Sequence, residues 1–161
     1  MKKLWVIGDT HFNHTNIIKY TNRPFRSVEE MNETIINNWN RVVGDEDLVI
    51  HLGDFGFFWK EEQAKEFADR LSGRKILILG NHDRKKWDWK AIGFEGVTKK
   101  LVFQDFIFSH KPLQPKDNPQ LKQNIHGHIH DKNSEFFWQS NVCVEKINYT
   151  PLEVFWRGGI Y

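Results

Sequence analysis

Several features that define common classes of protein are scarce or missing in this chain. Its 161 residues include a single cysteine, Cys143, which excludes an internal disulfide and fits a reducing compartment. No apolar stretch reaches the ~18 residues that a membrane-spanning helix requires. The apolar start at residues 4–7 is broken by Gly8-Asp9, too early for a signal peptide. We therefore predict a cytoplasmic protein without a membrane partner.

A strong excess of charge is also missing. The chain has 23 Lys and Arg against 21 Asp and Glu, a net charge of +2. Nucleic-acid-binding domains usually carry a basic stripe and a pI above ~9, so nucleic acid is a less favoured partner than a small molecule. Hydrophobic residues make up 39% of the chain, as in ordinary globular proteins, and 14% are aromatic. We attribute the high aromatic content mainly to a core built from large rings.

Short apolar runs predict buried strands with two helices between the early ones. The strands are expected at residues 4–7, 48–52, 75–79, 101–109, 123–126 and 152–156. Ser27, followed by Glu30, predicts a capping box that opens a helix towards Val43. A second helix is predicted over residues 60–71, and the proline-rich segment 111–119 is predicted to be a loop. This alternation predicts a single α/β domain over residues 1–161.

Polar clusters follow five of these predicted strands. They are Gly8-Asp9-Thr10-His11, Gly53-Asp54, Gly80-Asn81-His82-Asp83, Ser109-His110 and Gly127-His128-Ile129-His130. Loops at strand ends of an α/β sheet converge on one crevice. In an extended segment, residues two apart point the same way, which predicts that the Asp9–His11 and His128–His130 pairs each face one ion. Mixed oxygen and imidazole ligands favour Mn, Fe, Zn, Co or Ni over Ca or Mg.

The order and spacing of these clusters resemble the five-block signature of calcineurin-like metallophosphoesterases, from residue 9 to residue 130. The resemblance implies a four-layer α-β-β-α sandwich with two mixed β-sheets and no cap domain. It also implies two divalent transition-metal ions, with manganese placed before iron, zinc, nickel and cobalt. The implied ligands of one ion are Asp9, His11, Asp54 and His130, and those of the other are Asp54, Asn81, His110 and His128.

The same resemblance implies a reaction. Two cations ~3.5–4 Å apart would lower the pKa of a bridging water and orient the hydroxide for in-line attack on phosphorus. His82 would protonate the leaving oxygen as general acid, and Asp83 would either orient His82 or shape the turn. The implied function is a phosphoesterase. A phosphodiesterase that acts on a small-molecule or nucleotide ester is preferred to a phosphomonoesterase.

The cluster at Asp54 departs from the large protein phosphatases of that family. Their Val-Asp-Arg-Gly run is replaced by Phe55-Gly56-Phe57-Phe58, which disfavours a phosphoprotein phosphatase and removes a phosphate-binding arginine. Arg23 or Arg26 could supply the missing cation, because arginine binds phosphate bidentately. His14 could reach the substrate side of the ions. For each of these three residues an ordinary surface role is an equal alternative.

Two other functions stay open. One is a nuclease of the same family, disfavoured because we expect no room for added DNA-binding regions. The other is a non-catalytic metal-binding scaffold, disfavoured by the complete ligand set with His82. The segment 84–90 mixes charges and rings and could bind a nucleic-acid strand, although an amphipathic surface helix is the preferred interpretation. His51 and His126 are predicted to be structural, and the oligomeric state stays open, a homodimer being one alternative.

Overall fold

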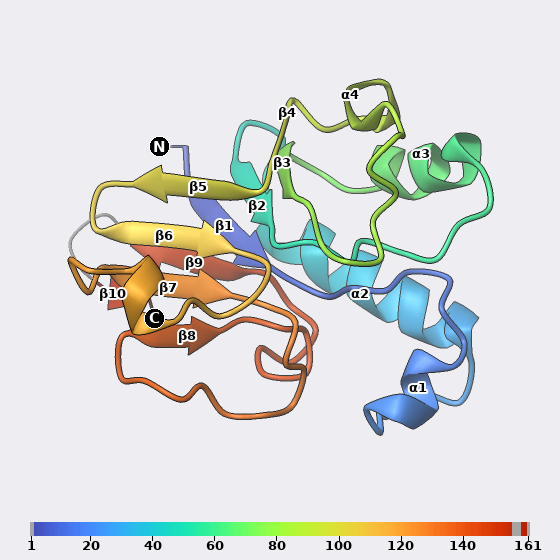
Figure 1. The fold of residues 1–161 in the computed structure, drawn as a ribbon. Helices are drawn as coiled ribbons and strands as arrows, with labels where there is room; N and C mark the ends of the chain where they lie inside the picture. Colours follow the sequence, from blue (N-terminus) through green and yellow to red (C-terminus); the bar gives the residue numbers. More distant parts are fainter. Residues whose placement is uncertain (1, 156–158, 161) are drawn as a thin grey trace.

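The computed structural model describes residues 2–155 and 159–160, which form two β-sheets (Figure 1). The larger sheet has the order β10-β9-β1-β2-β3-β4. Its strands are β1 (Leu4–Ile7), β2 (Leu48–His51), β3 (Arg74–Ile78), β4 (Gly96–Thr98), β9 (Leu152–Phe155) and β10 (Gly159–Ile160). The smaller sheet, β5-β6-β7-β8, contains β5 (Lys100–Phe103), β6 (Phe106–Ser109), β7 (Gln123–His126) and β8 (Gln139–Asn141).

Both sheets are mixed. Strands β1 to β4 run parallel, whereas β9 is antiparallel to β1. In the smaller sheet, β5 is antiparallel to β6, and β6, β7 and β8 run parallel. The arrangement of two mixed sheets that the resemblance implied is confirmed.

The parallel strands of the larger sheet are joined by helical crossovers, as parallel pairing requires. These are α2 (Val28–Val42), α3 (Glu61–Asp69) and the single turn α4 (Trp89–Ile92), and α1 (Ile17–Tyr20) precedes α2. The hydroxyl of Ser27 accepts the Glu30 N–H at 3.1 Å, which confirms the predicted start of α2. Among the described residues, the connections of the smaller sheet contain only one helical turn, η1 (Pro115–Asp117). No helix in the described part of the chain could cross a bilayer.

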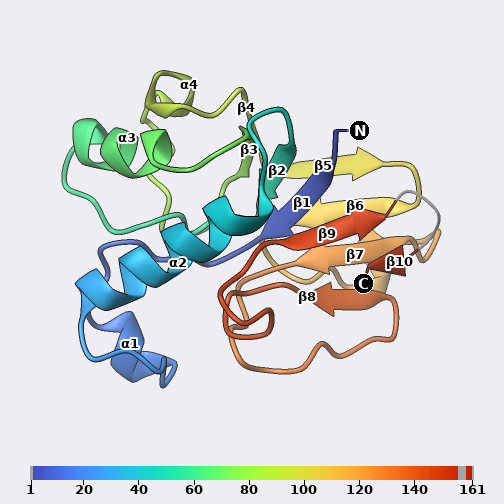
Figure 2. The same ribbon diagram turned by 180° about the vertical axis from the view of Figure 1, so that it is seen from behind.

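Strand β1 contributes to two hydrophobic clusters, one on each face of the larger sheet. Trp5 and Ile7 pack in the cluster that contains the apolar face of α2, whereas Leu4 and Val6 pack against the smaller sheet. Figures 1 and 2 show α2 and α3 together on one side of the molecule, away from β5–β8. The largest fully buried side chains include Trp39, Phe12, Phe55, Phe94 and Phe108. Large rings therefore contribute to the core, as predicted, beside aliphatic side chains such as Ile35 and Leu77.

Two predicted elements are wrong. The single strand over residues 101–109 is a hairpin of β5 and β6, turned by the polar pair Gln104-Asp105 with a φ of 53° at Gln104. The amphipathic helix at residues 84–90 is not formed; only the short α4 begins there, capped by Asp88 through the Ala91 N–H. Residue 156 of the last predicted strand lies outside the described residues.

Candidate metal centre

Five of the seven predicted ligands lie in left-handed turns. The φ angle is 58° at Asp9, 49° at His11, 53° at Asp54, 72° at His128 and 52° at His130. The expected extended conformation is therefore wrong. Asp9 and His11 still face one candidate ion position, as predicted, whereas His128 and His130 face different ones. A left-handed residue other than glycine costs ~1–2 kcal/mol, and backbone hydrogen bonds between the turns hold this conformation. The Asp9 N–H donates to the Gly53 carbonyl and the His11 N–H donates to the Asp54 carbonyl, both at 3.0 Å.

Two glycines leave space for the ligand carboxylates. A Cβ atom at Gly80 would clash with Asp54 Oδ1, and one at Gly127 would clash with Asp9 Oδ2. These two oxygens accept neighbouring backbone N–H groups, from His82 at 2.9 Å and from His128 at 2.8 Å respectively. Each carboxylate is thus oriented through one oxygen, which leaves Asp54 Oδ2 and Asp9 Oδ1 for other partners.

The predicted ligands gather into two groups. We call them the Asp9 group, which contains Asp9, His11 and His130, and the Asp54 group, which contains Asp54, His110 and His128. Within each group the candidate ligand atoms lie within 4.8 Å of one another. Asp54 Oδ2 lies between the groups, 3.6 Å from His11 Nε2 and 3.5 Å from His110 Nε2. Asn81 joins the Asp54 group, with its Oδ1 atom 2.9 Å from His110 Nε2.

The chemistry of these atoms fits cations. Asp9 Oδ1 and His11 Nε2 are buried and have no hydrogen-bond partner in the described structure. Burial, together with the nearby Asp54 charge, raises the pKa of Asp9 to about 8. Burial also lowers the pKa of His11, and it lowers the pKa of His128 to about 4. Unpaired acceptors and neutral imidazoles in a buried site are unfavourable until a cation binds them. The two groups can therefore hold a dinuclear centre.

A buried ion pair between Arg23 and Glu145 contacts the Asp9 group through hydrogen bonds. The Arg23 guanidinium donates to the carbonyls of Asp9 and Thr10 at 2.8 and 2.9 Å, and to Glu145 at 2.9 Å. Glu145 lies 3.0 Å from His130 Nδ1. Burial alone would lower the pKa of His130, but the hydrogen bond and charge of Glu145 outweigh it and raise the pKa. The side chain of Arg23 has no exposed surface, so our prediction that it binds substrate phosphate fails.

Glu145 is the functional residue that sequence reasoning missed. It stands two residues after Cys143, on the segment that follows β8. This position lies outside the five polar clusters at the strand ends. A signal was present in the lone acid beside the apolar run Val142-Cys143-Val144.

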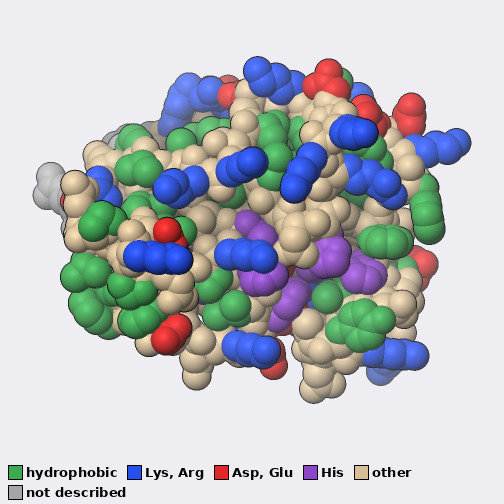
Figure 3. All heavy atoms as spheres, viewed as in Figure 1, with side chains coloured by type: hydrophobic (Ala, Val, Ile, Leu, Met, Phe, Trp, Pro, Cys, Tyr) green, Lys and Arg blue, Asp and Glu red, His purple; other side chains and the backbone are tan. Residues whose placement is uncertain are grey.

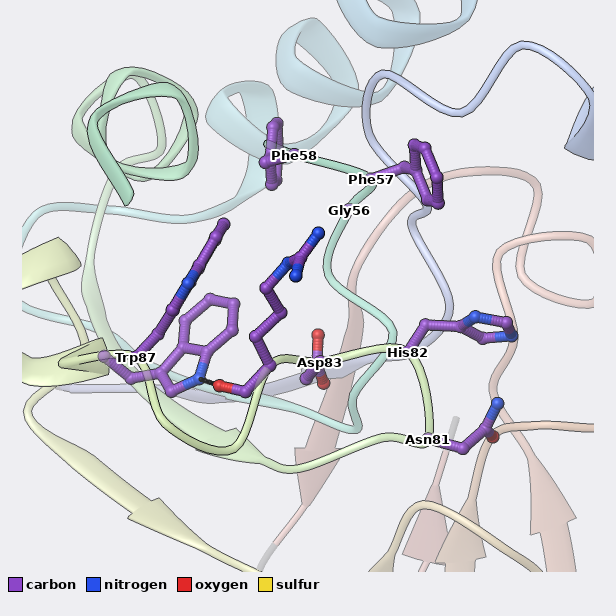
Figure 4. Close-up of a pocket in the computed structure, with 9 residues that line it drawn as sticks. Gly56, Phe57, Phe58, Asn81, His82, Asp83 and Trp87 are labelled. Carbon is purple, nitrogen blue, oxygen red and sulfur yellow. Dashed lines mark hydrogen bonds between the residues drawn. The ribbon is translucent and has the colours of Figure 1, made fainter. Parts of the chain in front are cut away.

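The loop after β3 presents two side chains to the centre and turns a third inward. Figure 4 shows Asn81 and His82 extending to the same side, whereas Asp83 does not approach the His82 ring. His82 is half exposed, and its Nε2 atom lies 4.0 Å from Asp54 Oδ2. The buried Asp83 carboxylate instead accepts the N–H groups of Gly80, Asp54 and Phe55 at 2.7–3.0 Å. Of our two alternatives for Asp83, the structure supports the shaping of the turn.

His14 lies at the edge of the centre. Its Nδ1 atom is 3.3 Å from His11 Nδ1, and its ring stacks on the exposed Phe57 with centroids 5.1 Å apart. It lines a cavity of about 430 Å³ together with His11, His82, His128 and His130. Arg26 is exposed just before α2. Substrate contacts by His14 and Arg26 stay predictions.

The two histidines predicted to be structural are buried and hydrogen-bonded. His51 contacts the Thr10 hydroxyl at 3.0 Å and accepts the Gly53 N–H at 3.1 Å. His126 lies 2.9 Å from both the Gly127 carbonyl and the Ser134 hydroxyl. Burial lowers the pKa of His51 to about 3, so this ring is neutral at physiological pH.

Comparison with known proteins identifies the class to which this centre belongs. The family model described as "Calcineurin-like phosphoesterase" matches residues 2–158, and the chain belongs to this family. An uncharacterised protein of Methanocaldococcus jannaschii is 40% identical over 162 residues, which cover 96% of this chain and 88% of that protein. The Gene 66 protein of Mycobacterium phage L5 is 36% identical over 85 residues, 52% of this chain and 41% of the phage protein.

Solved structures support the same fold. A protein of unknown function from Aquifex aeolicus superposes with a TM-score of 0.75 at 26% identity, covering 95% of this chain and 96% of that one. A nuclease of Pseudomonas putida superposes with a TM-score of 0.55 at 19% identity, covering 79% of this chain and 61% of the nuclease. The second likeness concerns the fold alone.

Proposed function

We propose that this chain is a metal-dependent phosphodiesterase with two transition-metal ions, manganese being the first candidate. The observation that supports this most is a pair of buried atoms, Asp9 Oδ1 and His11 Nε2, that have no hydrogen-bond partner among the described residues. Asp54, whose Oδ2 atom lies between the two groups, would be shared by both ions. When bound, two divalent cations supply a nucleophile from water at neutral pH and neutralise charge on the phosphoryl oxygens.

The side chains of the chain itself would hold the ester and transfer a proton. His82 is half exposed beside Asp54 and can protonate the leaving oxygen, a contribution of ~10²–10⁴-fold in rate. Arg23 is bound to Glu145 and to backbone carbonyls, so it offers no guanidinium to a dianionic monoester. This supports a preference for diesters.

The proposal includes a reducing compartment such as the cytoplasm. The lone thiol of Cys143 is buried and donates to Asp9 Oδ2 at 3.3 Å. Burial raises the pKa of this thiol, which keeps it protonated and unreactive. Oxidation there would remove one of the hydrogen bonds that orient a ligand of the Asp9 group.

The test is activity of metal-stripped protein on bis-p-nitrophenyl phosphate and p-nitrophenyl phosphate, with Mn, Ni, Co, Zn and Mg added back singly. We expect a transition metal to restore turnover, with the diester cleaved faster. His82→Ala should lower kcat by ~10²–10⁴-fold and leave the metal content unchanged. Failure of every metal, although two ions are bound by elemental analysis, would overturn the proposal in favour of a non-catalytic scaffold.

A further inference from the structure

A groove lined by lysines borders the Asp54 group. Its cavity of about 410 Å³ reaches Asn81 and His110, and its cationic lining is Lys85, Lys99, Lys100 and Lys111. These lysines come from three separate segments: the loop after β3, the junction of β4 and β5, and the residue that follows His110 after β6. The fold therefore gathers four ammonium groups beside one candidate ion position.

These four lysines have no acidic partner within the described residues, in contrast to Lys2 and Lys65. Lys2 pairs with Glu46 at 3.1 Å, and Lys65 pairs with Asp69 at 2.9 Å. Figure 3 shows Lys and Arg side chains beside and above the cluster of histidines on this face. Like charges gathered without acids repel one another, and a bound anion would relieve this repulsion.

The positive charge of the groove extends to the metal centre. Lys111 follows His110 directly in the chain, and Asn81 and His110 line the same cavity as the four lysines. A phosphate bound next to the scissile one would therefore lie in the same positive field. The near-neutral charge of the whole chain does not oppose this, because the relevant charge is local.

Aromatic side chains lie on the other side of Asn81. A second cavity, of about 330 Å³, shares Asn81 with the groove and is also lined by His82, Phe57, Arg84 and Trp87 (Figure 4). The Arg84 guanidinium lies 5.5 Å from the centre of the Trp87 ring. Phe57 is 44% exposed, so a flat ligand ring can reach it. Trp87 is partly exposed and packs against the core, so Phe57 is the more open ring. An exposed ring that flanks a cationic groove is typical of single-strand binding sites, in which bases stack and phosphates are neutralised.

We propose that the groove of Lys85, Lys99, Lys100 and Lys111 binds the phosphate backbone of a single-stranded nucleic acid next to the scissile phosphate, while bases on the other side contact Phe57 and Trp87. Cleavage of the strand rests on the proposed phosphodiesterase function. Binding of the strand does not.

The first experiment measures binding without cleavage. Metal-stripped full-length protein in EDTA is titrated into a fluorescein-labelled thymidine strand of about 12 nucleotides, within the usual site size, at several salt concentrations. For single strands, log Kobs falls with log salt by ~0.7 per neutralised phosphate. Lys99→Gln/Lys100→Gln should thus reduce the slope by ~1.4 and weaken binding ~25-fold at ~0.1 M salt.

A matched control removes the same charge elsewhere. Lys2→Gln/Lys65→Gln takes two lysines from ion pairs outside the groove and should leave affinity and slope unchanged. Phe57→Ala should weaken binding ~5-fold with the same slope, because stacking on one ring is lost and no charge changes. Equal losses in both lysine pairs would overturn the groove proposal, since net charge alone would then explain binding. Tight binding of ATP without binding of the strand would also overturn it, in favour of a polyphosphate site.

Parallel assays of wild-type protein separate this inference from the proposed function. Metal-dependent hydrolysis of bis-p-nitrophenyl phosphate without strand binding would overturn the groove and leave the phosphodiesterase intact. Lysine-dependent strand binding without hydrolysis of any ester would overturn the phosphodiesterase and leave the groove intact. Both activities together, with the strand cut only when transition metal is added, are the expected result.

Discussion

The Asp9 and Asp54 groups are built from similar side chains but satisfy their polar atoms differently. In the Asp9 group, Asp9 Oδ1 and His11 Nε2 have no partner within the described structure. In the Asp54 group the candidate ligands contact one another, since His110 Nε2 lies 2.9 Å from Asn81 Oδ1 and 3.2 Å from His128 Nδ1. An ion at the Asp54 group must replace these contacts, whereas an ion at the Asp9 group replaces no hydrogen bond that these two atoms make within the described residues. The Asp9 group should therefore bind its ion more tightly.

The largest expected effect removes the residue that the two groups share. Asp54→Asn keeps a side chain of the same shape but removes the charge between His11 and His110. Loss of Lewis-acid stabilisation worth several kcal/mol predicts a ~10³-fold fall in diester hydrolysis. Elemental analysis should show that both ions are lost. Asp45→Asn, at an exposed position, is the control. Retention of either ion would show that the groups are independent.

Removal of the ions should also destabilise the fold. At ~100 times Kd a bound ion adds ~2.7 kcal/mol to the free energy of unfolding. Without ions, the raised pKa of Asp9, about 8, means that its protonated form is favoured in the fold. Protonated Asp9 therefore stabilises the metal-free fold. This stabilisation is complete below the ordinary pKa of an aspartate and is lost as pH rises through about 8.

Urea unfolding in EDTA at several pH values checks this predicted loss of stability with rising pH. Wild-type protein should lose stability between about pH 4 and pH 8 relative to Asp9→Asn, which has no proton to release there. The variant should in turn gain less stability from added metal. An equal pH dependence in both proteins would contradict the raised pKa of the buried Asp9 carboxyl.

A smaller effect is expected from a change in the Arg23–Glu145 ion pair that contacts the Asp9 group. Glu145→Gln removes the negative charge that faces His130 and Arg23, and a change of this kind lowers metal affinity ~10–100-fold. Calorimetric titration should show the tighter of two binding steps weakened and the weaker step unchanged. Glu95→Gln, in an exposed ion pair with Arg74, is the matched control. Equal weakening of both steps would mean that Glu145 supports the whole fold instead.

The smallest effect is expected at the exposed ligand of the Asp54 group. Asn81→Ala removes one neutral contact worth ~1 kcal/mol, so the affinity of the weaker step should fall ~5-fold. The tighter step should not change. If the tighter step moved, the assignment of the two steps to the two groups would be reversed.

The residues that gather into the two groups could be predicted from sequence, but the backbone that presents them could not. Asp9, His11, Asp54, His128 and His130 follow apolar runs, and strand ends converge in any α/β sheet. The left-handed conformation of Asp9 and His11 depends on hydrogen bonds that their N–H groups donate to the Gly53 and Asp54 carbonyls, which only the folded chain brings near.

The ion pair that contacts the Asp9 group could not be predicted, because tertiary structure brings its two residues together. Arg23 and Glu145 are 122 residues apart, and neither belongs to the five polar clusters at the strand ends. The apolar pattern does not reveal the hairpin at residues 101–109, because its two turn residues, Gln104 and Asp105, interrupt an otherwise continuous apolar run. Patterns along the chain thus predicted elements and ligands, whereas pairs made by tertiary contact needed coordinates.

The left-handed turns have a consequence for protein design. A ligand set copied onto an idealised scaffold with extended strand ends would have the right side chains on the wrong backbone. Asn and Asp enter the left-handed region several times more readily than most residues, whereas alanine resists it. Transplanting this centre would therefore require moving each turn together with the carbonyl that receives its N–H group, as Gly53 does for Asp9. The unit that can be transferred is the pair of interlocked loops.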